Sequence, residues 1–190
     1  MSESFKDNRE RDNYILPEGN VDALLMEILI PPKKRYNQQG GAPAVTTKMK
    51  GQLADCFAVG ILDKDQRKVH YKNEFDVLVE KHGVTLYRHK IASKHHYFIC
   101  HPKFEKWILA EAKQLGLSLE HYNLPQEFNE LKKITQPESC KNDPRLKKLF
   151  KDLKNKEANG ITTLLKWTDY LISNTYKADK TTLINIGNAP

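Results

Sequence analysis

The 190-residue sequence lacks the features that mark membrane, secreted and disulfide-stabilised proteins. No apolar run approaches the roughly 20 residues that a membrane-spanning helix needs, and the charged stretch 1–12 contains no signal-peptide core. The cysteines at positions 56, 100 and 140 are widely spaced and form no CxxC pair, which argues against a disulfide framework or a zinc knuckle. We therefore expect a cytoplasmic protein with no membrane partner, whose cysteines are buried free thiols.

Two further absences concern function. The sequence contains no GxxxxGK[ST] motif, so ATP would act only through a separate ATPase partner. It also contains no internal repeat, and its length fits one domain, or one domain with a helical extension. What the sequence has in excess is positive charge, with a formal net charge of +7. This charge favours an acidic partner, and nucleic acid is the first candidate.

Apolar runs and turn residues alternate along the first two thirds of the chain. Strands are expected at 13–16, 57–62, 84–87 and 97–100, and helices at 21–30, 46–53, 72–81 and 102–116, with a loop at 33–43. The unbroken apolar character of 57–62 is typical of a parallel strand that is buried on both faces. The alternation predicts an α/β fold with a mostly parallel sheet flanked by helices.

The last third of the chain has a different pattern. Segments 125–134, 144–153 and 160–173 carry apolar residues at helical spacing and contain no convincing strand. We expect an α/β domain at 13–116 and a helical extension at 117–180 that packs on it, because short amphipathic helices need a surface to cover. The ends are expected to be a disordered N-terminus at 1–12 and a flexible tail at 181–190.

The densest positive charge lies between residues 141 and 156. It comprises Lys141, Arg145, Lys147, Lys148, Lys151, Lys154 and Lys156. On one interpretation Lys147, Lys148 and Lys151 bind nucleic acid through its phosphates. The other interpretation is a solvated helix face without a function, since charge runs are common on helix surfaces.

Carboxylates stand where the predicted strands meet turns or helices. Glu18 follows the first strand, and Gly19 lets the chain turn with no side chain in the way. Asp22 falls in the first turn of the next helix, near Glu18 if the turn is tight, although the helix dipole alone also favours an acid there. Glu105 opens a later helix. Such oxygen ligands suit a hard cation, and the sequence therefore predicts a Mg²⁺ or Mn²⁺ site.

Asp63 and Asp65 form the central pair of this predicted site. Residues i and i+2 project in the same direction on leaving a strand, so both carboxylates can face one ion. They follow the buried strand 57–62, and open parallel sheets bind their ligands at the carboxyl edge. A polar turn that merely ends the strand is the other interpretation.

In their order and spacing these motifs resemble the Toprim domain of topoisomerases, primases and OLD-like or RloB-like nucleases. The resemblance covers 13–116 and rests on 16–22 as the glutamate motif and 60–65 as the DxD motif. Defence-associated members often carry a further segment that is similar to 101–109. The chain departs from the pattern at Pro17, where these domains commonly have an apolar residue, and it lacks the ATPase domain of OLD-type nucleases.

The resemblance implies a Mg²⁺-dependent nuclease that hydrolyses phosphodiesters, in a phage-defence system. Glu18 would then be the general acid or base or a metal ligand, Asp63 and Asp65 would hold Mg²⁺, and Asp22 and Glu105 would add a second site. One ion would polarise the phosphate, and two would also stabilise the entering and leaving oxygens. The candidates for a basic side chain near the phosphate are Lys48, Lys50, Arg67, Lys90 and Lys94.

Two other functions remain open at this point. One is a non-catalytic Toprim-like module that binds nucleic acid or a protein partner through its basic surface. The other, less favoured, is a phosphatase of the haloacid-dehalogenase type with Asp63 as nucleophile, against which Gln66 occupies the place of a small or aliphatic residue. Six histidines between residues 70 and 101 could also supply a general base or transition-metal ligands, and His96 and His101 are the first to test.

Overall fold

The computed structural model describes residues 14–32, 36–64 and 69–188, and within them one five-stranded sheet runs through the molecule. The strands, in their order across the sheet, are β1 (Ile15–Pro17), β2 (Ala58–Asp63), β5 (His96–His101), β4 (Val84–His89) and β3 (Phe75–Lys81). The pairs β1–β2 and β2–β5 are parallel, and β5–β4 and β4–β3 are antiparallel. Four of the five strands therefore point the same way and β4 runs against them, so the predicted mostly parallel sheet is a mixed one with two parallel and two antiparallel pairs.

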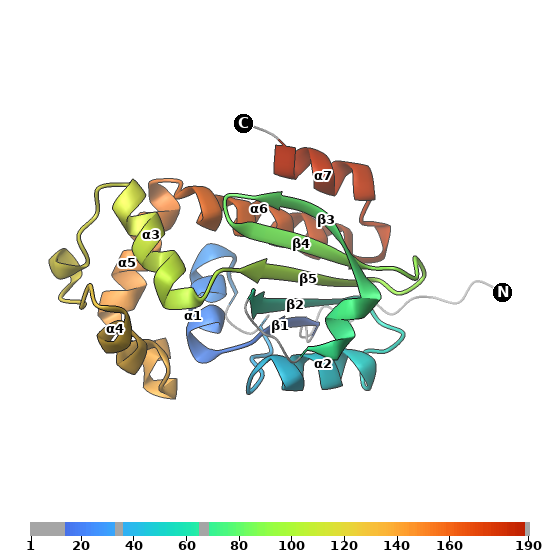
Figure 1. Cartoon of the computed structure of the whole chain (residues 1–190), viewed down its shortest axis with the longest axis horizontal. Helices are drawn as coiled ribbons and strands as arrows, with labels where there is room; N and C mark the ends of the chain where they lie inside the picture. The colour runs from blue at the N-terminus through green and yellow to red at the C-terminus, as the bar shows by residue number, and fades with distance from the viewer. Residues whose placement is uncertain (1–13, 33–35, 65–68, 189–190) are drawn as a thin grey trace.

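Helices cover both faces of this sheet (Figure 1). They are α1 (Asn20–Leu29), α2 (Ala42–Lys50), α3 (Phe104–Gln114), α4 (Phe128–Thr135), α5 (Pro144–Asn155), α6 (Asn159–Asn174) and α7 (Lys180–Asn188), with short 3-10 turns η2 (His70–Glu74), η3 (Leu119–Tyr122), η4 (Glu138–Asn142) and η5 (Thr175–Lys177). Helix α2 lies on one side of the sheet and α6 on the other. The fold is α/β, and its last third is helical, as expected.

The alternation of side chains along the strands builds two cores. In β2, Val59 and Ile61 belong to the larger core with α1, α3, α5 and α6. Ala58 and Leu62 belong to the smaller core under α2. The two sets point to opposite faces because successive strand residues alternate. This double burial explains the unbroken apolar run, and it makes β2 the strand that fixes the site at its end.

The predicted helix at 72–81 is wrong. The segment forms η2 and the edge strand β3, and β3 returns into β4 through His82 and Gly83. Both turn residues have positive φ angles, of 49° and 78°, as in the two-residue turns that close β-hairpins. The pair that suggests a helix end is therefore a hairpin turn.

The expected flexible tail is also wrong as far as Asn188. Residues 180–188 form α7, which packs on β3 and buries Leu183 completely. The indole of Trp167 donates a hydrogen bond to the carbonyl of Leu183 at 3.1 Å. Among the cysteines, Cys100 and Cys140 are buried as expected, but Cys56 is exposed. The expected disorder at 1–12 lies outside the described residues.

Candidate metal centre at the carboxyl edge of the sheet

The three parallel neighbours β1, β2 and β5 end at one edge of the sheet, and each delivers a titratable group there. Glu18 follows β1, Asp63 is the last residue of β2, and His101 is the last residue of β5, directly opposite Asp63 in the register. The amide of Glu18 donates to the carbonyl of Ile61 at 2.9 Å, which extends the β1–β2 pairing by one residue. The parallel arrangement itself therefore brings the three groups together.

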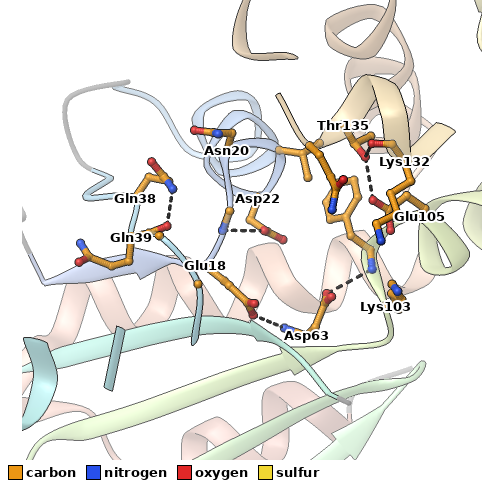
Figure 2. Close-up of a pocket in the computed structure, with 16 residues that line it drawn as sticks. Glu18, Asn20, Asp22, Gln38, Gln39, Asp63, Lys103, Glu105, Lys132 and Thr135 are labelled. Atoms are coloured by element: carbon orange, nitrogen blue, oxygen red, sulfur yellow. Dashed lines mark hydrogen bonds between the residues drawn. The ribbon is translucent and has the colours of Figure 1, made fainter. Parts of the chain in front are cut away.

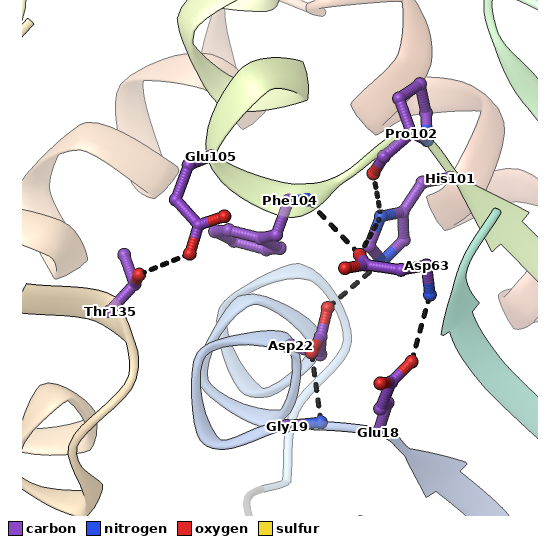
Figure 3. A network of polar contacts seen from close by, with 9 residues as sticks. All are labelled: Glu18, Gly19, Asp22, Asp63, His101, Pro102, Phe104, Glu105 and Thr135. Atoms are coloured by element: carbon purple, nitrogen blue, oxygen red, sulfur yellow. Dashed lines mark hydrogen bonds and ion pairs between the residues drawn. The ribbon is translucent and has the colours of Figure 1, made fainter. Parts of the chain in front are cut away.

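Asp22 joins them from the first turn of α1. Its Oδ2 accepts a hydrogen bond from the amide of Gly19 at 3.0 Å, and its Oδ1 lies 3.0 Å from Nε2 of His101 (Figure 3). A Cβ atom on Gly19 would lie 2.9 Å from Oδ2 of Asp22, so a side chain at this position would push the carboxylate away. The tight turn expected from Gly19 is thus what places Asp22 beside His101.

Glu18 is held against the end of β2. Its Oε2 accepts a hydrogen bond from the amide of Asp63 at 3.1 Å. Burial raises the pKa of Glu18 to about 7, and the negative charges of Asp63 and Asp22 add to the effect, which outweighs this hydrogen bond. A carboxyl group with such a pKa exchanges its proton near neutral pH.

Asp63 lies between Glu18 and the start of α3. Its Oδ1 accepts a hydrogen bond from the amide of Phe104 at 3.2 Å and lies 3.4 Å from Nδ1 of His101. Burial raises the pKa of Asp63 to about 6; the charge of His101 opposes the shift, whereas the charges of Asp22 and Glu105 reinforce it. Two neighbouring carboxyl groups are therefore destabilised as anions at the same sheet edge.

His101 is fully buried and serves as a cation between two carboxylates. Its Nε2 faces Asp22, and its Nδ1 lies 2.7 Å from the carbonyl oxygen of Pro102. Both partners are acceptors, so both ring nitrogens carry protons. Burial alone would lower the pKa of His101, but the hydrogen bond to Asp22 and the charges of Asp22 and Asp63 raise it to about 9. The ring also stacks on Trp107, with centroids 4.7 Å apart.

The donor set fits a hard divalent cation at the carboxylates. Asp22, Asp63 and His101 each offer one ligand atom, and these atoms lie within 4.8 Å of one another. His101 would have to lose a proton before it could coordinate an ion, whereas carboxylate oxygens need no such change once ionised. Glu18, Asp22 and Asp63 are therefore better ligands for a hard cation than His101 is. Asp65, the other member of the predicted pair, lies outside the described residues.

These carboxylates open into a cavity of about 490 Å³ (Figure 2). Glu105 also lines it, from the far side, where the hydroxyl of Thr135 donates to its Oε1 at 2.7 Å. The lysines that line the cavity are Lys103 and Lys132, which the sequence did not single out. To predict that these two lysines share a cavity, one must know that α3 and α4 pack together, which the sequence does not show.

The basic residues that the sequence favoured lie elsewhere. Lys147, Lys148 and Lys151 are on α5 and do not line the cavity, and neither do Lys48, Lys50, Lys90 or Lys94. Arg67 lies outside the described residues. Lys154, from the same basic run, donates to the carbonyls of Ile28 and Leu29 at the end of α1 and is therefore structural.

Of the six histidines, which are all described, His101 is the one at the carboxylates. His96 is at the opposite end of β5, where its ring bonds to the hydroxyl of Tyr71 at 2.6 Å and to the carbonyl of Leu53 at 2.8 Å. Burial lowers the pKa of His96, which keeps this ring neutral. Its role is structural. Knowing that β2 and β5 are parallel would have distinguished His101 from His96. In a parallel pair the last residues of both strands lie at the same edge, so His101 lies beside Asp63 and His96 lies at the opposite edge.

In comparisons with known proteins, no family model, curated protein or solved structure matches the chain. Within the described residues no helix is both long and apolar enough to cross a membrane. Fold and chemistry of the site therefore carry the functional argument.

Proposed function

We propose that this chain is a nuclease that hydrolyses phosphodiesters with Mg²⁺ or Mn²⁺ at a Toprim-like carboxylate site. One observation carries the proposal: Glu18, Asp22 and Asp63 converge on a single cavity from two adjacent parallel strand ends and the following helix. A bound divalent cation would relieve the repulsion among these carboxylates and would polarise a phosphate. The lysines on the far wall suit the same anion.

The roles follow from the surroundings of each residue. Glu18, with a pKa of about 7, can take up or release a proton near neutral pH and is the general acid or base. Asp63 and Asp22 supply the oxygen donors for the cation. Glu105 lines the same cavity and is our candidate donor for a second ion. A separate ATPase partner and a role in phage defence remain predictions from the resemblance.

The geometry of His101 favours a second candidate, a module that binds nucleic acid without cleaving it. The imidazolium already places one positive charge between Asp22 and Asp63, with nitrogen to oxygen distances of 3.0 and 3.4 Å. A site that carries its own cation binds an added one less tightly. For the phosphatase, Oδ1 of Asp63 is engaged by His101 and the amide of Phe104, so Oδ2 would have to be the nucleophile.

Cleavage assays with matched variants test the nuclease. Labelled single-stranded and duplex DNA and RNA are incubated with the full chain and Mg²⁺, Mn²⁺ or EDTA, and the products are sized on denaturing gels. We expect Asp63→Asn and Glu18→Gln to lose cleavage by at least about a hundredfold, because each removes an anionic oxygen from the site. The controls Asp55→Asn and Glu120→Gln change exposed carboxylates that do not line the cavity.

These controls should cleave at the wild-type rate. Undiminished cleavage by both site variants would refute the nuclease. If the wild-type chain binds nucleic acid but yields no product with either metal, the non-catalytic module replaces it.

A further inference from the structure

We propose that Lys103 and Lys132 hold the phosphate of an unpaired nucleic-acid strand in the cavity. This inference rests on the proposed function and deepens it, since it names the residues that receive the phosphate and the class of substrate. The two residues are called the lysine wall below. They face the carboxylates from the start of α3 and the last turn of α4, on the side of the cavity that also holds Glu105 and Thr135 (Figure 2).

The lysine wall is built into the packing of α3 against α4. Lys103 immediately precedes α3, and its Nζ lies 4.9 Å from the ring centre of Phe128 on α4. Lys106, one turn later on α3, approaches the same ring at 5.7 Å. The attraction of a cation to an aromatic face helps to hold the Lys103 side chain near the cavity. Lys132 reaches the cavity from the last turn of α4.

Neither lysine of the wall has an acidic partner among the described residues. Lys133, next to Lys132, shows the contrast, because it pairs with Glu130 at 2.6 Å and does not line the cavity. Both wall lysines are half-buried rather than fully solvated. Two ammonium groups left unpaired at the border of a cavity attract an anion, and lysine binds phosphate as a point charge.

The opposite side of the cavity indicates how the nucleic-acid strand is oriented in it. Residues 37–41, which we call the strap, run beside β1: the amides of Asn37, Gln39 and Gly41 donate to the carbonyls of Ile15, Pro17 and Glu18 at 3.0–3.1 Å. The strap lines the cavity through Gln38, Gln39 and the glycines that follow. It presents no charged side chain, so the phosphate belongs on the side of the lysine wall. Uncharged amides can hydrogen-bond to a base or a sugar.

The size of the cavity selects an unpaired strand. A volume of about 490 Å³ lies within the range of roughly 300–1,000 Å³ that is usual for small-molecule sites. It therefore admits about one nucleotide between the strap and α4. An unpaired strand can turn a nucleotide into this space directly. A duplex would first have to unstack and unpair one nucleotide, which costs free energy.

Binding and cleavage by three proteins test the inference. They are the wild type, Lys103→Gln/Lys132→Gln, and the control Lys147→Gln/Lys148→Gln/Lys151→Gln, which neutralises the run on α5. The probes are a fluorescein-labelled 15-mer single strand and the duplex of the same sequence. Dissociation constants are measured at several salt concentrations with Ca²⁺ in place of Mg²⁺, and KM and kcat are measured with Mg²⁺.

We expect the wall variant to bind the single strand at least about tenfold more weakly, with the salt slope reduced by about 0.7, since both lysines contact one phosphate and each neutralised phosphate on a single strand contributes about 0.7. Its KM should rise by a similar factor, the α5 variant should keep the wild-type KM, and the duplex should bind more weakly than the single strand. Unfolding midpoints check that all three proteins fold.

The outcomes separate the two proposals. If the wild type cleaves and the wall variant keeps its KM and salt slope, the lysine wall is refuted and the nuclease stands. If only the α5 variant loses affinity, the phosphate contacts belong to α5 and the inference again fails. Equal affinity for duplex and single strand overturns the assigned substrate class. No cleavage by the wild type refutes the nuclease itself.

Discussion

Replacing Glu18 by glutamine should make the metal-free protein more stable at pH 8, although it removes a proposed active-site group. The folded-state pKa of Glu18 is about 7, against an ordinary value of 4.5, so folding opposes its ionisation. Below pH 4.5 the group is protonated in both the folded and the unfolded chain, and it contributes no pH-dependent difference. Between pH 4.5 and 7 the unfolded chain ionises at Glu18 while the folded protein keeps the proton, so the folded protein loses stability over this range, and above pH 7 the loss is complete.

The size of the effect follows from the same two values. One pKa unit corresponds to about 1.4 kcal/mol, so full ionisation of Glu18 costs the folded state at most about 3 kcal/mol. Glutamine carries no charge, and its carbonyl oxygen can still accept the hydrogen bond from the amide of Asp63. For a chain of this length 1 kcal/mol corresponds to roughly 2–4 °C, so the midpoint should rise by up to about 10 °C.

Thermal and urea unfolding in EDTA at pH 5 and pH 8 measure the effect. At pH 5 the two proteins should differ by less than about 1 kcal/mol, because Glu18 is then mostly protonated when folded. The control Glu120→Gln alters an exposed carboxylate and should stay within about 0.5 kcal/mol of the wild type at both pH values. A Glu18→Gln protein that is no more stable than the wild type at pH 8 would refute the reasoning.

Three further predictions concern the same edge of the sheet and the core behind it. His101→Gln should destabilise the metal-free protein by about 3 kcal/mol at pH 6, because it leaves two carboxylates without their cation. The pKa of His101 is raised to about 9, so the difference in unfolding free energy between variant and wild type should shrink as the pH rises through 9. Urea titrations measure this difference, and a value that does not change with pH would contradict the prediction. Mg²⁺ should raise the unfolding midpoint more at pH 8 than at pH 6, because Glu18 and Asp63 must release protons to bind it, and an equal rise at both pH values would contradict the site. Gly60→Ala should lower the free energy of unfolding, measured in urea, by about 1–3 kcal/mol, since the new Cβ would lie 2.6 Å from the ring of Phe98 and 2.9 Å from Val45. A decrease of less than about 0.5 kcal/mol would contradict this, because it would mean that the neighbouring side chains move aside at little cost.

The parts of the fold that the sequence predicts are those with strong local signals. The strand β2 follows from an apolar run that is buried on both faces, and α3 follows from helical spacing after Pro102. The edge strand β3 was missed because its burial does not alternate cleanly, and the decisive signal was the two-residue turn at His82 and Gly83. Helix α7 was missed because the partner surface that stabilises it, on β3, is distant in the sequence.

The same distinction holds for the site. Glu18, Asp22 and Asp63 could be chosen from the sequence because each lies at the end of a predicted strand or in the first turn of a predicted helix. His101 as their counter-charge required the register between β2 and β5, which pairs it with Asp63. Lys103 and Lys132 required the packing of α3 on α4. Charge density alone pointed to α5 instead, since counting lysines along the chain gives no information about which cavity they face.

The strap has a consequence for how the protein behaves at high concentration. By donating three amides to the β1 region it occupies the hydrogen-bonding positions that an edge strand would otherwise offer to another molecule. The strap therefore both lines the cavity and covers the edge of the sheet at β1. A variant that loosens residues 37–41 should lose solubility and ligand binding together, which would make aggregation in such variants a sign of a damaged site.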